Sequence, residues 1–449
     1  MKTKFLPKIA AALFGLLSLV ACSAKSLDDV VQLRVELDRT VLPADCTGRA
    51  VVKVCLDGLR LPRAEARPPV NLSIVIDRSG SMAGEKIARA REAALEALGR
   101  LAPDDILSVV TYDTEVQTLV PAQCVGDGRR IAAAIRGINT GGSTNLFGGV
   151  SQGASEVRKH TEDRRYIHRV ILLSDGLANV GPQTPEELGR LGTALVKEGI
   201  SVTTVGLGLG FNEDLMTRLA QRSDGNTYFV ESSDDLPRIF GGELGDVLNV
   251  IARRVVVEVN FPEGVRPLSF VGRDGVIRGR KAEITLNQLY GGQEKFALIE
   301  VEVPATRAGT EIELASAQLS YENALTQKTS TIRAQRKITF SENHERVVGS
   351  ANLKVQTDYA ANIIAVTKDK AVELVDADRR QDAAKEMRQK AAELKAAAMT
   401  YSNAPMAALA EEQVREADKL EKQGLSNAAR KTYRAESVQT KNQQSSSGN

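Results

Sequence analysis

The stretch that decides the fold of this chain runs from Val70 to Ser81 and reads VNLSIVI followed by DRSGS. Its first seven residues form an apolar-rich run that is typical of a strand buried in a sheet. Asp77 follows this run, and Ser79 and Ser81 come two and four residues later. A carboxylate and two hydroxyls at a strand end offer hard oxygen ligands, which suit Mg²⁺, Mn²⁺ or Ca²⁺ better than Zn²⁺. The stretch therefore predicts a buried strand with a candidate metal site at its carboxyl end.

Around this stretch, apolar runs alternate with amphipathic helical patterns. The predicted strands are 70–77, 105–112, 169–175 and 201–208, and the predicted helices are 85–101, 145–160, 184–199 and 212–223. Val170–Leu173 is apolar at every position, as in a parallel strand that is covered on both faces. The alternation predicts a doubly wound, mostly parallel α/β domain, in which ligands bind at the carboxyl ends of the strands.

Patterns typical of β-strands flank this domain on both sides. The clearest are Val31–Leu37 before it and Val255–Val259, Phe296–Val301, Ala315–Leu319 and Thr331–Arg333 after it. The N-terminal strands are too few to form a stable sheet alone, so we expect them to join the later ones. The sequence thus predicts that the α/β domain is inserted in a β-sandwich.

The chain becomes helical and rich in Ala, Lys, Glu and Gln beyond about residue 345. Two apolar stripes have the three-four spacing of helices that pack together. They consist of Ala384, Met387, Ala391, Leu394 and Ala398, and of Met406, Ala410, Val414 and Ala417. We therefore predict a helical hairpin or small bundle at this end of the chain.

These patterns divide the chain into six segments. They are a signal segment at 1–22, an N-terminal β segment at 26–66, the α/β domain at 67–250, the β-sandwich at 251–345, a helical region at 346–440 and a disordered tail at 441–449. The tail ends in glutamines, serines, glycine and asparagine, a composition that cannot bury apolar surface.

The N-terminus resembles an export signal. Three lysines in the first eight residues precede the apolar run Ile9–Ala21, which is too short for a membrane span. The run ends in LVACS at residues 19–23, which resembles the lipobox of bacterial lipoproteins. That resemblance implies a lipid anchor at Cys22 and a place in the bacterial cell envelope, in the outer membrane if the host is Gram-negative. The alternative is an ordinary secretory signal in which Cys22 has no role.

The net charge limits the class of partner, and the remaining cysteines bear on possible disulfides. With 59 basic and 57 acidic residues the net charge is only +2, which argues against nucleic acid as a partner. Export permits disulfides, and Cys46 and Cys55 are close enough in sequence to form one. We expect Cys124 to be free and buried.

Two further oxygen-bearing residues extend the cluster around Asp77. Thr144 lies in the glycine-rich segment Gly141–Asn145 before a predicted helix, and Asp175 ends the next buried strand. Together the residues fit the pattern D-x-S-x-S…T…D and resemble the metal-ion-dependent adhesion site of von Willebrand factor A domains. The resemblance covers roughly residues 70–250, up to a last helix near 234–249. The whole arrangement resembles bacterial von Willebrand A lipoproteins, and its central part is similar to inter-alpha-trypsin inhibitor heavy chains.

This resemblance implies a role for each member of the site. Ser79, Ser81 and Thr144 would supply hydroxyl ligands, while Asp77 and Asp175 would act through water or accept hydrogen bonds. Two nearby carboxylates leave a divalent cation electrophilic, so it can recruit a Glu or Asp from a protein partner. Mg²⁺ fits best because it readily keeps an exchangeable water at an open position.

Several alternatives remain open at this stage. The serines and aspartates could be helix caps and turn formers, the metal could be purely structural, or the helical tail could act as an envelope scaffold. A phosphohydrolase is disfavoured because Ser79 stands where a second acid would be needed. No serine-hydrolase elbow is present, and we expect His160 and His168 to be solvated. We therefore predict no catalysis.

Overall fold

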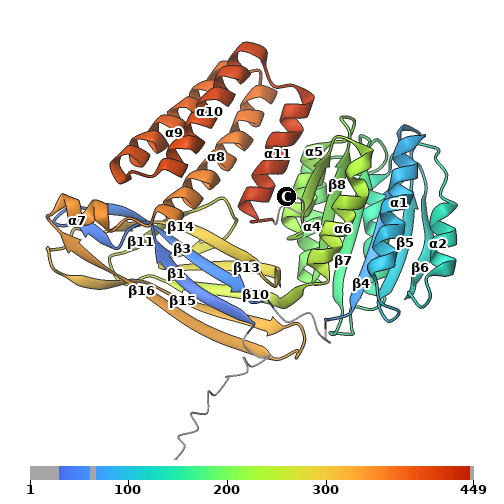
Figure 1. Ribbon diagram of the computed structural model, residues 1–449, viewed down its shortest axis with the longest axis horizontal. Coiled ribbons are helices and arrows are strands. Elements are labelled where there is room, and N and C mark those ends of the chain that lie inside the picture. The colour runs from blue at the N-terminus through green and yellow to red at the C-terminus, as the bar shows by residue number, and fades with distance from the viewer. Residues whose placement is uncertain (1–29, 61–66, 445–449) are drawn as a thin grey trace, which may run out of the picture.

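A six-stranded sheet is the centre of the α/β domain in the computed structural model, which describes residues 30–60 and 67–444 (Figure 1). Its strand order is β6-β5-β4-β7-β8-β9, and only β6 runs antiparallel to its neighbour. The strands are β4 (Val70–Asp77), β5 (Ile106–Tyr112), β6 (Val116–Cys124), β7 (Ile167–Ser174), β8 (Ile200–Leu207) and β9 (Thr227–Val230). The predicted doubly wound, mostly parallel sheet is confirmed.

Helices cover both faces of this sheet. They are α1 (Glu85–Arg100), α2 (Arg129–Arg136), α3 (Leu146–Arg158), α4 (Pro185–Lys197), α5 (Glu213–Arg222) and α6 (Leu236–Val247). One core joins α1, α2 and α6 to residues such as Ile74 and Ile76 of β4. A second core joins α3, α4 and α5 to Val75 of β4 and Val170 of β7. Because both faces are covered, β4, β5, β7 and β8 are buried at every position.

Two further sheets pack face to face as a sandwich. One has the order β1-β3-β14-β11 and the other β12-β13-β10-β15-β16-β2. Their strands are β1 (Val31–Leu37), β2 (Val41–Pro43), β3 (Gly48–Gly58), β10 (Val250–Asn260), β11 (Arg266–Val271), β12 (Val276–Arg278), β13 (Lys281–Tyr290), β14 (Glu294–Val303), β15 (Glu311–Asn323) and β16 (Thr329–Ser341). β3 pairs with β14 in antiparallel register, with Val52 opposite Ile299. The N-terminal strands therefore join the later ones, as predicted.

The C-terminal part forms a helical bundle. Its helices are α8 (Leu353–Asp376), α9 (Arg380–Tyr401), α10 (Ala404–Gln423) and α11 (Asn427–Lys441), whereas the short α7 (His344–Gly349) lies against β2 and β16 of the sandwich (Figure 1). The predicted stripe on α9 is buried along its whole length. On α10 the buried stripe runs through Gln413 and Leu420, whereas Val414 is only half-buried, so that prediction was wrong at one position. Among the described helices none combines the length and apolar character needed to cross a membrane.

The start of the expected tail is ordered, which corrects one prediction. Lys441 ends α11, and Gln443 and Gln444 hydrogen-bond to the body of the protein. The Oε1 atom of Gln444 accepts from the backbone N–H of Thr227 at 3.0 Å, and that of Gln443 accepts from Phe296 N–H at 3.1 Å. Residues 441–444 thus link the bundle to the α/β domain and to the sandwich through hydrogen bonds. The rest of the tail and the signal segment with Cys22 lie outside the described residues.

The predictions for the cysteines and for His168 also need correction. Cys46 and Cys55 are both free, because β3 begins at Gly48 and carries Cys55 about 23 Å along the extended strand. Cys55 is buried, whereas Cys124 ends the edge strand β6 and is exposed rather than buried. His168 is buried as well, since it lies within the central strand β7.

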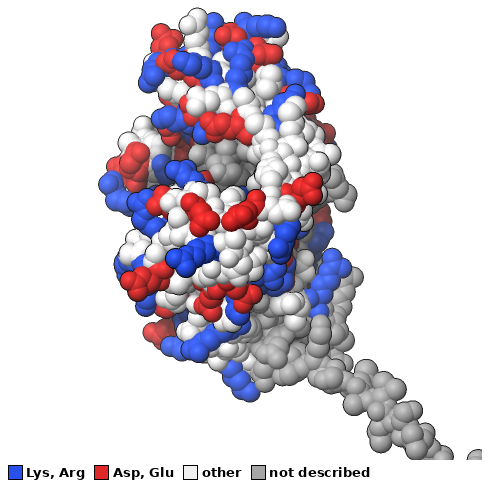
Figure 2. All heavy atoms as spheres, turned by 90° about the vertical axis from the view of Figure 1, so that its left-hand side faces the viewer, with Lys and Arg blue, Asp and Glu red and all other residues white. Residues whose placement is uncertain are grey.

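Acidic and basic side chains are interspersed over the bundle and the far end of the sandwich. Figure 2 shows this face, on which blue and red residues alternate and neither sign forms a broad patch. The pattern agrees with the near-balance of charge in the whole sequence.

Candidate functional site

Three loops bring the predicted oxygen-bearing side chains to one edge of the central sheet. β4 and β7 are parallel neighbours, with Ile76 opposite Leu173, so Asp77 and Asp175 leave the sheet side by side. Ser79 and Ser81 lie in the turn between β4 and α1, and Thr144 lies just before α3. Asp77, Ser79, Thr144 and Asp175 are all buried.

The oxygen atoms of this edge are in direct contact. Ser79 Oγ lies 3.1 Å from Ser81 Oγ, and Ser81 Oγ donates a hydrogen bond to Asp175 Oδ1 at 2.8 Å. Thr144 belongs to the same cluster, because its hydroxyl and that of Ser81 both lie next to Gly176. A Cβ at Gly176 would lie 3.1 Å from Thr144 Oγ1 and 3.5 Å from Ser81 Oγ. The structure therefore brings the hydroxyls and the Asp175 carboxylate together around Gly176, which has no side chain.

Asp77 is fixed beneath this cluster. Its Oδ1 accepts from the backbone N–H of Ser79 at 2.8 Å, and its Oδ2 accepts from Ser174 Oγ at 2.8 Å. Burial raises the pKa of the Asp77 carboxyl, and the hydrogen bonds from Ser79 and Ser174 oppose that shift. Ser174 was missed in the sequence, although its place at the strand end directly before Asp175 was a usable signal.

Backbone contacts hold the loop that carries Thr144. The backbone N–H of Thr144 donates to Asn179 Oδ1 at 2.8 Å, and that of Asn145 donates to the carbonyl of Asp113 at 2.8 Å. The side chain of Asn145 caps α3 by accepting from Gly148 N–H at 3.0 Å. Asn179 and Asp113 come from other loops and belong to no motif, so their roles could not be predicted from the sequence.

Two cations lie at this edge, and one of them, Arg78, is paired with Asp113 at 3.0 Å instead of with a carboxylate of the motif. Among the described residues, the ammonium of Lys86 at the start of α1 is the one cation that pairs with Asp175, and its side chain is 37% exposed. Asp77 has no cationic partner and relies on neutral donors. Lys86 was not predicted from the sequence.

The donor set fits a small hard cation. Neighbouring ligands of an octahedral Mg²⁺ ion lie about 2.9 Å apart, which is close to the 2.8 and 3.1 Å contacts around Ser81. Within residues 30–60 and 67–444 no group of three or more His, Cys, Asp or Glu residues could hold a metal. A cation at this edge would depend on the hydroxyls, and hydroxyls favour hard ions over zinc.

Two exposed leucines flank the edge. Leu177 follows Asp175 by two residues and is 60% exposed, and Leu209 in the loop after β8 is 50% exposed. The two loops are in contact, because a Cβ at Gly210 would lie 2.7 Å from the carbonyl oxygen of Asp175. The polar cluster therefore has apolar side chains at its rim.

The fold is that of a mostly parallel α/β domain with a polar candidate site at the carboxyl ends of its strands. Residues 71–241 match the family model of the von Willebrand factor type A domain, and the chain contains such a domain. Domains of this family commonly mediate metal-dependent protein interactions.

Relatives in sequence include bacterial and animal proteins. An uncharacterized protein of Synechocystis is 26% identical over 278 residues, which cover 60% of this chain and 65% of that protein. Human inter-alpha-trypsin inhibitor heavy chain H3 is 27% identical over 202 residues, which cover 43% of this chain and 22% of that one. The chain thus spans less than two thirds of the length of these relatives.

Solved structures share the fold over most of the chain. A von Willebrand factor type A protein from Catenulispora acidiphila has a TM-score of 0.66 at 16% identity and covers 87% of this chain and 89% of its own. The ArnB paralog VWA2 from Sulfolobus acidocaldarius has a TM-score of 0.60 at 17% identity, with 92% and 98% covered. These likenesses concern the fold, including the parts outside the central domain.

Proposed function

We propose that this chain is a divalent-metal-dependent protein-binding module. The observation that carries the proposal is the convergence of three hydroxyls and two carboxylates at the carboxyl edge of β4 and β7. Ser79, Ser81 and Thr144 would hold the cation, with Mg²⁺ preferred and Mn²⁺ or Ca²⁺ as alternatives. Asp77 and Asp175 would balance its charge. When bound, the cation supplies an electrophilic position for a carboxylate from a Glu or Asp of the partner.

The residues around the site would prepare it for this role. Ser174 and the backbone of Ser79 keep the Asp77 carboxylate turned toward the edge, so little reorganisation is needed on binding. Ser81 is already oriented by its bond to Asp175. Hydroxyl ligands add no negative charge, and a cation held by two carboxylates retains affinity for a third acid.

The exposed rim supports a protein as the partner. Leu177 and Leu209 are two of the six large hydrophobic residues that are exposed in the described parts of the chain, and both lie beside the polar cluster. Exposed apolar side chains around a polar centre are typical of interaction sites. An acidic side chain of the partner would reach the centre while apolar groups around it cover the leucines.

Capture of a partner from envelope extract tests this function. The immobilised full chain should retain a partner in Mg²⁺, lose it in chelator, and fail to retain it as Asp77→Ala. Asp163→Ala is the matched control, because Asp163 is a half-buried aspartate that precedes the opposite end of β7 and pairs with the exposed Arg165. Capture that is indifferent to chelator, or equal in wild type and Asp77→Ala, would contradict the proposal.

We propose that the module binds without turnover. Ser79 lies at the position where a phosphatase-like site needs a second carboxylate for proton transfer, and a hydroxyl does not serve there near neutral pH. Release of phosphate from a generic phosphoester, lost in Asp77→Ala, would argue for a hydrolase instead.

We propose that a lipid at Cys22 anchors the module to the bacterial cell envelope, in the outer membrane of a Gram-negative host. Support comes from the signal-like segment and the LVACS sequence at residues 19–23. Labelling with a fatty-acid analogue should mark the wild-type chain and not Cys22→Ser. Equal labelling of both would refute the anchor without affecting the proposed metal site.

A further inference from the structure

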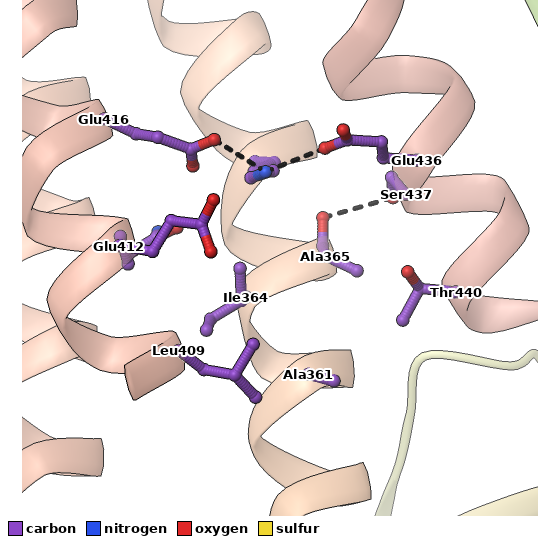
Figure 3. A pocket seen from close by; sticks show the side chains of 11 residues that line it. Ala361, Ile364, Ala365, Leu409, Glu412, Glu416, Glu436, Ser437 and Thr440 are labelled. Atoms are coloured by element: carbon purple, nitrogen blue, oxygen red, sulfur yellow. Dashed lines mark hydrogen bonds and ion pairs between the residues drawn. The ribbon is translucent and has the colours of Figure 1, made fainter. Parts of the chain in front are cut away.

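A cavity of about 240 Å³ opens between α8, α10 and α11 of the helical bundle (Figure 3). Its lining combines aliphatic side chains with charged and amide groups. They are Ala361, Ile364, Ala365 and Lys368 of α8, Leu409, Glu412, Gln413 and Glu416 of α10, and Glu436, Ser437 and Thr440 of α11. The volume is below the range of drug-sized sites and suits a single small group.

Gln413 is the unusual member of this lining. It occupies a position in the buried stripe of α10 where the helical period calls for an apolar residue, and it is 1% exposed. Neither Nε2 nor Oε1 of its amide has a hydrogen-bond partner. A buried amide without partners costs folding free energy, and such groups are nearly always satisfied. The amide of Gln413 therefore offers one acceptor and a donor group to whatever enters the cavity.

The charges of the cavity favour a cation. Lys368 is already satisfied, because its Nζ lies 3.0 Å from Glu416 Oε1 and 2.9 Å from Glu436 Oε2. The same ammonium also lies 4.8 Å from the centre of the Tyr433 ring. Glu412 has no ion-pair partner among the described residues, and Figure 3 shows its carboxylate turned toward α8. Three carboxylates thus face one lysine, which disfavours an anionic ligand.

The cation expected here is organic rather than a metal. No group of three or more His, Cys, Asp or Glu in residues 30–60 and 67–444 is placed to hold a metal ion, and these three glutamates are part of that finding. Ile364 and Leu409 provide an aliphatic part of the lining beside the carboxylates (Figure 3). An alkyl chain can lie against such a lining while its charged end stays among the carboxylates.

We propose that this cavity binds an alkyl ammonium or alkyl guanidinium group. The charged end is held by Glu412 and by the acceptor oxygen of Gln413. The alkyl chain lies against Ile364 and Leu409, and the Nε2–H group of Gln413 can donate to an acceptor oxygen where the ligand has one, such as the peptide carbonyl of a lysine residue. A lysine or arginine side chain of a polypeptide and a free amine share this chemistry.

Two probes and one neutral control test the site on the full chain. The probes are Nα-acetyl-lysine N-methylamide and putrescine, and the control is the norleucine analogue of the first probe, which has the alkyl chain without the charge. We expect NMR shifts or calorimetric heats with the lysine probe and none with the norleucine analogue. Tighter binding of the lysine probe than of putrescine indicates a polypeptide side chain as the source, and the reverse indicates a free amine. Binding of neither probe, or equal binding of the norleucine analogue, would overturn the proposal.

Variants localise the binding to this cavity. Glu412→Gln should weaken the lysine probe about tenfold or more, because it removes the unpaired carboxylate. Glu411→Gln is the matched control, since this neighbouring glutamate of α10 faces Lys395 of α9 instead. Gln413→Leu should lose affinity while its melting temperature stays equal or rises. Equal affinity in wild type, Glu412→Gln and Gln413→Leu would place the ligand elsewhere and refute the assignment.

Discussion

The α/β domain contains two buried polar clusters that differ in charge balance. At the joint with the sandwich, the guanidinium of Arg169 lies 3.5 Å from the carboxylate of Glu243 and donates to Gln288 and Tyr290 of β13. At the sheet edge, the partly exposed Lys86 pairs with Asp175, while Asp77 accepts hydrogen bonds only from the neutral donors Ser79 and Ser174. The joint is therefore neutralised within the protein, while the edge has a negative charge in excess.

This difference separates structural clusters from binding sites. Charges that are matched inside the chain tie two parts together, as Arg169 of β7 ties the α/β domain to the sandwich. Charges without a counter-charge in the chain, or an amide such as Gln413 without a hydrogen-bond partner, can be satisfied by a bound ligand. The edge and the helical cavity belong to the second kind.

Breaking the joint should have the largest effect on stability. Arg169→Met leaves Glu243 buried without its cation, which should cost about 3–5 kcal/mol in the free energy of unfolding. Arg165→Met removes an exposed arginine of the same domain and should cost at most about 1 kcal/mol. Chemical denaturation of both variants measures the difference. A similar small loss in both would mean that the joint is not held by its buried charges.

Protonation of the buried, neutral His168 should have the next largest effect on stability. His168 lies at the amino end of β7, opposite the end that Asp175 follows. Burial of the imidazole, and then the charge of Arg253, lower the pKa of His168 from 6.5 to about 4. The unfolded chain therefore binds a proton that the folded chain refuses as the pH falls from about 6.5 to about 4. Stability is full above that window and declines within it by up to about 3 kcal/mol. His168→Gln should flatten this part of the pH profile, and an unchanged slope would exclude His168 as its source.

Removing the lysine at the edge should have the smallest effect. Lys86→Met abolishes a positive charge in contact with Asp175, so the affinity for a divalent cation should rise severalfold, and less so at high salt. Arg89→Met removes a charge one turn along the same helix, where it pairs with exposed acids, and should change the affinity less. A lower affinity in Lys86→Met would show that the lysine positions Asp175 instead of competing with the metal.

Much of the fold could be predicted because its central strands are rich in apolar residues. β4, β7 and β8 were predicted to within two residues, since burial on both faces makes their sequences rich in aliphatic and β-branched residues. The edge strand β6 was missed, because it is largely exposed and contains Pro121. The short β9 and the eight-residue α2 gave too little periodicity to detect.

The five motif residues could be predicted because each follows or precedes a recognisable element. Adjacent parallel strands then bring them to one edge without further information. Asn179 and Lys86 support the site through contacts that no local pattern encodes. Gln413 is the opposite case, since the apolar stripe predicted on α10 passed through Val414 and hid the buried amide beside it. Clusters assembled from distant segments become visible only in three dimensions.

A direct titration of the edge with Mn²⁺ tests the central claim most sharply. Electron paramagnetic resonance counts the free ion, so it reports binding without any partner. Wild-type chain and Asp163→Ala should bind one Mn²⁺ that Mg²⁺ displaces, and Asp77→Ala should lose this site while keeping its thermal melt. Equal Mn²⁺ binding by wild type and Asp77→Ala, or none by wild type, would contradict the assignment of the five oxygen-bearing residues as a metal site.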